Sequence, residues 1–445
     1  MNKNYEINFG LKAKEIVERH QKVILSTTMV PYPLVGSKAK GEIVEDVDGN
    51  SYIDFSSAVA VTNIGYNHPK VVKAIKTQVE KLSHFAGNDY YNENQVILAE
   101  KLVKITPGKF SKKVFFSNSG AESVECAFKI ARWCKKKPGM ISFLGAFHGR
   151  TFGALSLSAC RAAHKKHYLP LVPSVMHVPY AYCYRCPYGL EYPSCGLWCA
   201  DYIDEVLLYH YPKEDTAALI AEPIQGEAGY IAPPMEFHKR LQKICKDNGL
   251  IFIMDEVQSG FGRTGKMFAS ELYNVQPDVI CLAKGLSGGI PIGATVSRID
   301  VAGWPEGSSS HSNTYGGNVL ACAASIAKLE VIESENLSQK AVELGNYTIK
   351  RLKEYQEESS LVGDVRGKGL MIGVEFVKDK KTKEKAIKES ENISIEAFKR
   401  GLILLPVGDC CLRIAPPLNI SKENLDKGLE IMFDAIKTVE GGGSV

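Results

Sequence analysis

The 445-residue sequence lacks three features that would assign it to large classes of protein. No apolar run approaches the roughly 20 residues needed to cross a bilayer, and the first twenty residues contain no apolar segment of a signal peptide. Neither sign of charge dominates, since 54 basic residues stand against 50 acidic ones and the basic residues are scattered. These absences argue against a membrane, secreted or nucleic-acid-binding protein, and they predict a cytoplasmic location.

The composition indicates a globular protein with more than one domain. Hydrophobic residues make up 45% of the chain and charged residues 23%, close to the average for soluble proteins. The stretch GEIVEDVDGNSYIDFSS alternates apolar and polar residues around Asp48-Gly49, which predicts a β-hairpin. We expect an N-terminal segment over 1–64 that belongs to a small domain, a large domain over 65–330, and a C-terminal small domain over 331–445.

The region 65–330 alternates helical patterns, such as HPKVVKAIKTQVEKL, with short apolar runs. Short apolar runs between helices are typical of buried parallel strands. The large domain is therefore predicted to be α/β, with a doubly wound, mostly parallel sheet, and the C-terminal region to be a smaller α+β domain. The predicted strands are KKVFFS, GMISFL, TAALIAE, LIFIMDE and DVICLAK.

Ionisable residues close three of these runs: Glu222, Asp255 and Lys284. Ligands of open parallel sheets bind beyond the carboxyl ends of the strands, so we expect these side chains to meet at one cleft. A lysine in an apolar setting has a lowered pKa, which Schiff-base chemistry requires, and an aspartate suits a protonated pyridine nitrogen. The alternative is a structural ion pair between Asp255 and Lys284.

The turn after KKVFFS, residues 118–122, is the start of a predicted helix. Backbone N–H groups and the helix dipole at such a turn hold phosphate well. The same residues also fit an ordinary helix cap, with Ser119 as N-cap and Glu122 three residues later. From these residues alone, both interpretations stay open.

Several familiar motifs are absent or misplaced. Residues 260–265 match G-x-G-x-x-G, but four residues separate them from the strand ending at Asp255, and no long helix opens after them. The sequence has no Walker lysine motif, no H-E-x-x-H and no G-x-S-x-G. Dinucleotide binding, P-loop chemistry, zinc proteolysis and serine hydrolysis are therefore not indicated.

Six motifs together resemble the class III aminotransferases, which are pyridoxal 5′-phosphate enzymes of fold type I. They are SNSGAES, GAFHGRT, AEPIQGEAG, MDEVQSGFGRTG, LAKGLSGGIPIGA and TYGGNVLA, in the order of the family, and the resemblance covers nearly the whole chain. It implies transfer of an amino group from an ω-amino acid, with 4-aminobutyrate as best guess, to 2-oxoglutarate. Ornithine or acetylornithine aminotransferases and amino-acid racemases or epimerases on the same fold are the alternatives.

The resemblance implies a role for each residue at the cofactor. Lys284 forms the covalent bond to the cofactor and moves the proton during turnover, and Asp255 contacts the pyridine nitrogen. Gln258 reaches the phenolic oxygen, and Phe147 and Val257 pack on the two ring faces. The remaining cofactor-binding residues are Ser119, Gly120, Ala121 and His148.

The resemblance also implies how substrates and subunits are arranged. Arg413 binds the α-carboxylate of glutamate or 2-oxoglutarate, with Glu222 as its switchable partner, and Arg150 holds the distal carboxylate. Val59 is an apolar residue over the substrate. Thr314 reaches the phosphate of the neighbouring subunit, which implies a homodimer, or a dimer of dimers, with shared active sites. The partners are an amino acid and a 2-oxo acid.

One segment stands apart from this pattern. CYRCPYGLEYPSCGLWC places Cys183, Cys186, Cys195 and Cys199 in the spacing C-x2-C-x8-C-x3-C. Four thiolates so spaced suit a structural zinc, although the central gap is shorter than in common zinc modules. Buried free thiols and disulfides are the alternatives. The implied chemistry uses none of these sulfurs, so we expect no catalytic metal and a segment that packs through its aromatic residues and prolines.

Overall fold

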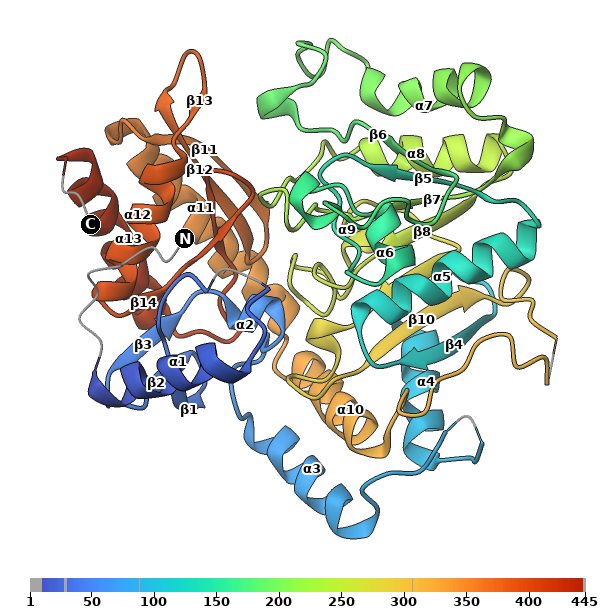
Figure 1. Ribbon diagram of the computed structural model, residues 1–445, viewed down its shortest axis with the longest axis horizontal. Helices are drawn as coiled ribbons and strands as arrows, with labels where there is room; N and C mark the ends of the chain where they lie inside the picture. The colour runs from blue at the N-terminus through green and yellow to red at the C-terminus, as the bar shows by residue number, and fades with distance from the viewer. Residues whose placement is uncertain (1–9, 28–29, 88, 306, 443–445) are drawn as a thin grey trace.

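The computed structural model describes residues 10–27, 30–87, 89–305 and 307–442, which form two halves lying side by side (Figure 1). One half is built around a large sheet. The other joins the N-terminal strands to the C-terminal part of the chain. No helix of the described chain is long and apolar enough to span a membrane.

The large sheet has seven strands in the order β4-β10-β9-β8-β7-β5-β6. The strands from β9 to β6 pair in parallel, and β10 runs antiparallel to both of its neighbours. In chain order the strands are β4 (Lys112–Ser117), β5 (Gly139–Phe143), β6 (Val175–Val178), β7 (Thr216–Ala221), β8 (Ile251–Asp255), β9 (Val279–Leu282) and β10 (Gly293–Arg298). The predicted doubly wound, mostly parallel sheet is confirmed.

Helices cover both faces of this sheet. Alternate residues of a strand enter different apolar clusters: Ile253 packs with α5, whereas Phe252 and Met254 pack with α7 and α8. This two-sided burial explains why the central strands are continuous apolar runs. The helices of this half are α3 (Pro69–Lys81), α4 (Glu93–Ile105), α5 (Gly120–Lys135), α6 (Phe152–Leu157), α7 (Trp198–Tyr209), α8 (Phe237–Asp247), α9 (Ala269–Leu272) and α10 (Val319–Ser334).

Two strands depart from the sequence prediction. Strand β4 was expected to be buried among parallel neighbours, but it lies at the sheet edge and is half-exposed. Of the strands that the structure describes, it pairs only with the antiparallel β10. Strand β10 itself was not predicted, because GATVSR mixes small and polar residues. Gly293 is required there, since a Cβ atom at this position would lie 2.2 Å from the Ser119 carbonyl oxygen.

The other half contains two smaller sheets. Strands β1 (Gly36–Lys40), β2 (Ile43–Asp46), β3 (Ser51–Asp54) and β14 (Leu402–Ile403) form the first, and the predicted hairpin is its β2-β3 pair. The second has the order β11-β12-β16-β15, with β13 added at β12. Its strands are β11 (Val362–Lys368), β12 (Met371–Asp379), β13 (Glu384–Lys385), β15 (Leu405–Val407) and β16 (Cys411–Ile414).

The helices of this half are α1 (Leu11–Val23), α2 (Ser57–Ala60), α11 (Leu337–Glu358), α12 (Ile387–Lys399) and α13 (Lys422–Glu440). One apolar cluster joins the two halves, since Val296 of β10, Ala321 of α10, Ile372 of β12 and Leu429 of α13 belong to the same core. The ends of the large sheet's strands are therefore held against β16 and the N-terminal segment, and the candidate site lies where these parts meet.

Candidate active site

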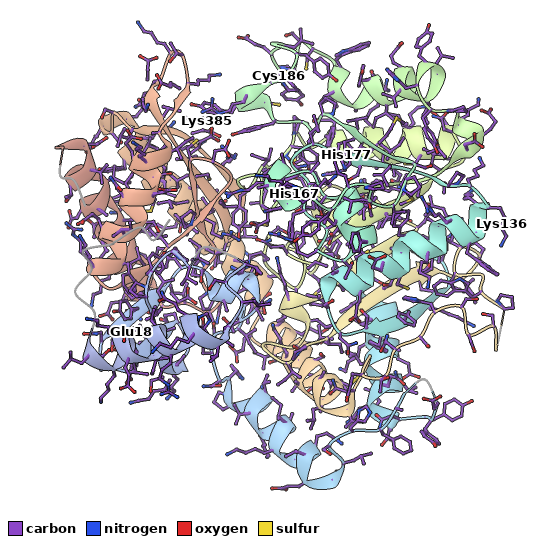
Figure 2. All side chains as sticks on the ribbon, viewed as in Figure 1. Glu18, Lys136, His167, His177, Cys186 and Lys385 are labelled. Atoms are coloured by element: carbon purple, nitrogen blue, oxygen red, sulfur yellow. The ribbon has the colours of Figure 1, made fainter. Side chains whose placement is uncertain are left out.

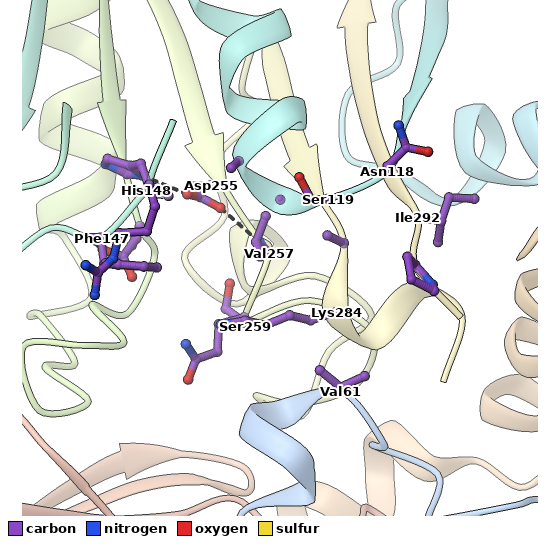
Figure 3. Close-up of a pocket in the computed structure, with 18 of the residues that line it drawn as sticks. Val61, Asn118, Ser119, Phe147, His148, Asp255, Val257, Ser259, Lys284 and Ile292 are labelled. Carbon is purple, nitrogen blue, oxygen red and sulfur yellow. Dashed lines mark hydrogen bonds and ion pairs between the residues drawn. The ribbon is translucent and has the colours of Figure 1, made fainter. Parts of the chain in front are cut away.

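A cavity of about 460 Å³ opens at the carboxyl ends of the central strands. Most residues predicted for cofactor and substrate line it, and Figure 3 shows how they surround the space. The predicted residues in the lining are Ser119, Gly120, Ala121, Phe147, His148, Arg150, Glu222, Asp255, Val257, Gln258 and Lys284. The structure thus brings together residues that lie up to 165 positions apart (284 − 119) in the sequence.

Lys284 follows strand β9 directly and begins a single 3-10 turn. Its backbone φ is 37°, in the left-handed region that non-glycine residues seldom adopt. Burial lowers the pKa of the Lys284 amine, although the nearby carboxylate of Glu227 opposes this shift. In the described part of the chain the amine makes no hydrogen bond or ion pair. The lowered pKa favours the unprotonated amine, which without a partner is suited to act as nucleophile and as base.

Asp255 ends strand β8, and both of its oxygen atoms are held in place. Its Oδ2 atom lies 2.7 Å from Nδ1 of His148, and its Oδ1 atom accepts a hydrogen bond of 3.0 Å from the backbone N–H of Val257 (Figure 3). Both side chains are buried. Because no ion pair joins Asp255 to Lys284 within the described residues, the alternative of a structural Asp–Lys pair is wrong.

The start of helix α5 forms one wall of the cavity. Ser119 is its N-cap, accepting a 3.2 Å hydrogen bond from the N–H of Glu122, and Glu122 in turn accepts bonds from Asn118. The cap interpretation is therefore confirmed. The cap uses the N–H of Glu122, so it leaves the N–H groups of Gly120 and Ala121 at a helix start that faces the cavity, where an anion is favourable.

The residues present fit a bound pyridoxal 5′-phosphate. A Cβ atom on Gly120 would lie 2.8 Å from Cγ1 of Val257, so only glycine leaves the space between the start of α5 and Val257 open. Among the described residues, neither the buried Oε1 atom of Gln258 nor the buried Nε2 atom of His148 has a hydrogen-bond partner. Such orphaned polar atoms beside a cavity are expected where a ligand supplies the missing partner.

The prediction that Glu222 pairs with Arg413 was wrong. Glu222 does not contact Arg413, because its carboxylate accepts hydrogen bonds from the backbone N–H groups of Phe147 (2.9 Å) and Gly226 (2.8 Å). Arg413 instead forms a two-armed pair with Glu227, with Nη1–Oε1 at 3.0 Å and Nη2–Oε2 at 3.4 Å. Glu227 lies past the turn at Gly226, which carries its side chain away from Glu222 and towards strand β16.

The two glutamates have opposite electrostatic environments. Burial raises the pKa of Glu222 to about 7, and the neighbouring Asp255 adds to this effect. Burial also acts on Glu227, but Arg413 and Lys284 outweigh it and lower the pKa of that carboxyl. Glu227 is therefore the ionised partner of the buried guanidinium.

Three predicted substrate or cofactor residues do not line the cavity. Arg413 is buried against Glu227, and Thr314 is exposed. Val59 lies in helix α2, where residues 57–60 all have positive φ values between 48° and 62°. This left-handed turn brings Val61 into the cavity wall in place of Val59 (Figure 3).

Arg150 lines the cavity and is exposed to solvent at its edge. Its guanidinium carbon lies 5.5 Å from the centre of the Phe147 ring, and its Nη2 atom lies 3.0 Å from Nε2 of His164. Neither His164 nor Glu227 was predicted from the sequence. Glu227 stands inside the quoted motif AEPIQGEAG, so its position was a usable signal, whereas nothing local marks His164.

The four clustered cysteines lie outside this site. Cys183, Cys186, Cys195 and Cys199 line a separate small cavity with several aromatic residues, and all four are free thiols. No three His, Cys, Asp or Glu side chains of the described chain are placed to hold a metal ion. This favours free thiols over zinc and disulfides, but the thiols are not buried as expected: Cys183 is exposed and the other three are partly buried.

The cysteine-rich segment, in which Figure 2 labels Cys186, contacts the other half of the fold through Arg185 and Tyr182. Arg185 donates a 2.5 Å hydrogen bond to Glu375 of strand β12, and Tyr182 contacts the same carboxylate. Arg366 lies 2.7 Å from the other oxygen of Glu375 and donates to the carbonyl of Gly229 at 2.7 Å. The segment is thereby tied to the loop that carries Glu227.

Comparisons with known proteins agree with this geometry. The family model for aminotransferase class III matches residues 24–436. The chain is 42% identical to a leucine/methionine racemase of Thermococcus litoralis, over 97% of both chains. It is 38% identical to a 4-aminobutyrate aminotransferase of Mycobacterium leprae, over 95% of both chains. The structure of a Bacillus anthracis aminotransferase superposes with a TM-score of 0.89 at 33% identity, covering 97% of this chain and 100% of that one.

The match extends over more than nine-tenths of the chain and includes both halves of the fold. It also agrees with a cavity lined by Lys284, Asp255 and the start of α5. The chain belongs to the class III aminotransferases, which depend on pyridoxal phosphate.

Proposed function

We propose that this protein is a transaminase that moves the amino group of an ω-amino acid to 2-oxoglutarate, with 4-aminobutyrate as the first donor to test. The observation that carries the proposal is a guanidinium group in the cavity wall together with a second one, behind the wall, that is paired with Glu227. Arg150 lines the cavity, and Arg413 is close enough to affect the pKa of Lys284. Two guanidinium groups suit a dicarboxylate acceptor, because each binds a carboxylate in a two-armed fashion.

An ω-amino acid donor has only one carboxylate, so the second guanidinium must be neutralised while the donor is bound. The Glu227–Arg413 pair supplies this neutralisation. When a dicarboxylate binds, its own carboxylate replaces Glu227 at Arg413. One site then accepts two substrates that differ by a negative charge.

The chain's other residues have defined tasks in this reaction. Pyridoxal phosphate, when bound, supplies a ring that accepts the electrons of the bond broken beside the amino group. Asp255, oriented by His148, would keep a proton on the ring nitrogen, and the N–H groups of Gly120 and Ala121 would hold the phosphate. Lys284 Nζ would take the proton from the carbon that bears the amino group and carry it during the transfer.

A donor panel tests the proposal. The enzyme is incubated with 4-aminobutyrate, ornithine, acetylornithine, lysine or β-alanine, each with 2-oxoglutarate or pyruvate, and the glutamate or alanine formed is measured. Glutamate formation from an ω-amine supports the proposal. Activity with pyruvate alone contradicts the dicarboxylate acceptor.

A racemase or epimerase is the second candidate, because the relative from Thermococcus litoralis bears the name leucine/methionine racemase. Such an enzyme needs Lys284 and a second proton donor but no oxo acid. Incubation of L-leucine or L-methionine in deuterium oxide without an oxo acid separates the two. Deuterated D-isomer would favour the racemase.

We further propose a homodimer in the cytoplasm. Thr314 is exposed and does not line the cavity of its own chain, so a phosphate contact by this residue requires a second subunit. Light scattering of the purified protein checks the subunit number, and a monomer would contradict a shared site.

A further inference from the structure

His164 lies beside the substrate arginine, outside every motif that identifies the family. It sits in the 3-10 turn Ala162–His164, within the loop between α6 and β6 that also contains His167 (Figure 2). Its Nε2 atom is 3.0 Å from Nη2 of Arg150, and its ring meets the Phe147 ring edge-on at a centroid distance of 6.2 Å. Arg150, Phe147 and His164 thus form one contact group at the cavity edge.

The hydrogen bonds fix the tautomer of His164. A guanidinium only donates, so Nε2 must be the unprotonated nitrogen that accepts from Arg150. The proton is then on Nδ1, which lies 3.4 Å from Sγ of Cys160 and donates to it. Burial raises the pKa of the Cys160 thiol to about 11, so the sulfur is a neutral acceptor. The two hydrogen bonds, from Arg150 to His164 and from His164 to Cys160, are consistent with a neutral imidazole.

We propose that His164 is a positioning residue that holds the Arg150 guanidinium at the cavity edge, ready for the distal carboxylate of the substrate. Arg150 is exposed, and a free arginine side chain samples many rotamers. The bond to His164 and the Phe147 ring restrict it before substrate arrives, which reduces the entropy lost on binding. The inference rests on the proposed function, since it assigns Arg150 to a carboxylate.

The charges around His164 favour the neutral form. Two cations, Arg150 and Arg161, and one carboxylate, Glu227, act on the imidazole. Its remaining titratable neighbour, Cys160, is neutral. Burial and the two arginines lower the pKa of His164, against the effect of Glu227. When acid protonates Nε2, that atom becomes a donor and releases Arg150.

The test measures binding of two non-reacting ligands to the holoenzyme by calorimetry. Glutarate has two carboxylates, and pentanoate has the same number of carbons with one. His164→Ala is expected to weaken both ligands roughly three- to tenfold, because Arg150 takes the distal carboxylate of glutarate and the single carboxylate of pentanoate, as expected for loss of a pre-organised side chain. His164→Gln, whose amide oxygen accepts a hydrogen bond, should retain most of the affinity. His167→Asn is the matched control, because His167 is exposed in the same loop and asparagine tolerates its φ of 66°.

A pH series adds a readout that a merely structural role would not change. Glutarate affinity of the wild type should fall on acidification through the pKa of His164, and the His164→Gln variant should lack this step. If His164→Ala binds glutarate like the wild type while Arg150→Ala does not, the positioning role is contradicted.

Failure of the proposed function gives a different result. If Arg150→Ala also leaves glutarate binding unchanged, Arg150 does not bind this carboxylate, and nitrogen NMR of ¹⁵N-histidine protein then tests the contact itself. The His164 signal, assigned by its loss in His164→Gln, should report an Nδ1–H tautomer whose pKa rises in Arg150→Ala. An unchanged titration would overturn the inference.

Discussion

Arg413 and Glu227 join strand β16 to the loop after β7 through two parallel contacts, Nη1–Oε1 at 3.0 Å and Nη2–Oε2 at 3.4 Å. Arg413 is buried, and its Nε atom has no partner among the described residues. Breaking a buried pair by removing one member is far more costly than exposing a surface pair, because a charge is left unpaired. The pair is therefore a structural contact, and under the proposed function it is also the place where a substrate carboxylate would replace Glu227.

Glu227→Gln should destabilise the apoenzyme by about 3 kcal/mol because Arg413 loses its counter-charge. Added glutarate should stabilise the variant more than the wild type, because in the variant the glutarate carboxylate does not compete with the Glu227 carboxylate for Arg413. Thermal unfolding with and without glutarate measures both effects. Glu214→Gln, at an exposed position, is the control, and equal glutarate effects in all three proteins would contradict the role of the pair.

Lys284→Ala should lower amino transfer by at least about a thousandfold, since both the covalent anchor and the base are lost. Borohydride treatment of the wild-type holoenzyme should leave the cofactor attached to Lys284, as mass spectrometry of peptides would show. The variant should carry no attached cofactor. Attachment at another lysine would contradict the assignment.

Gly120→Ala should weaken pyridoxal phosphate binding at least about tenfold, because the new methyl group meets Val257 at 2.8 Å. Fluorescence titration of the apoenzyme gives the dissociation constant. The double variant Gly120→Ala/Val257→Ala recreates the space and should recover part of the affinity. If the double variant binds no better than Gly120→Ala, crowding by Val257 is not the cause.

Glu222 should make the stability of the protein decrease as pH rises. Its folded pKa, about 7, is above the ordinary glutamate value, so between about pH 4.5 and 7 the folded state binds more protons than the unfolded state. Its contribution is complete below pH 4.5 and falls by up to about 3 kcal/mol by pH 8. Urea unfolding of the wild type and Glu222→Gln at pH 5 and pH 8 isolates the difference, and parallel pH trends in the two proteins would refute it.

Glu375→Gln should destabilise the protein by about 3 kcal/mol, because Arg185 and Arg366 both lose their shared acid. Urea unfolding gives the value. Glu384→Gln, which breaks only an exposed pair with Lys378 on the same hairpin, should cost less than about 1 kcal/mol. Similar losses in the two variants would show that the contact between the cysteine-rich segment and β12 is unimportant.

The sequence predicted the central strands and the residues at their ends because both follow local rules. Strands that are buried on both faces have continuous apolar sequences, which are easy to recognise. Parallel strands bring Glu222, Asp255 and Lys284 to one edge of the sheet. The motifs then identified the family. Strand β10 was missed because its residues are small and polar, and the edge position of β4 depends on that missed strand.

The substrate side was harder to predict because it depends on chain geometry. Choosing between Glu222 and Glu227 required knowing that the turn at Gly226 directs their side chains to different neighbours. Choosing Val61 over Val59 required four consecutive left-handed residues, which no propensity rule suggests at Ser57–Ala60. The contact of His164 with Arg150 comes from an irregular loop, where sequence carries little positional information.

The most direct test of the proposed function follows the nitrogen atom. The enzyme is incubated with ¹⁵N-labelled 4-aminobutyrate and unlabelled 2-oxoglutarate, and glutamate is analysed by mass spectrometry. The account predicts ¹⁵N-glutamate in an amount equal to the 4-aminobutyrate consumed, and none with Lys284→Ala. The absence of labelled glutamate, together with conversion of L-leucine to its D-isomer without any oxo acid, would contradict it.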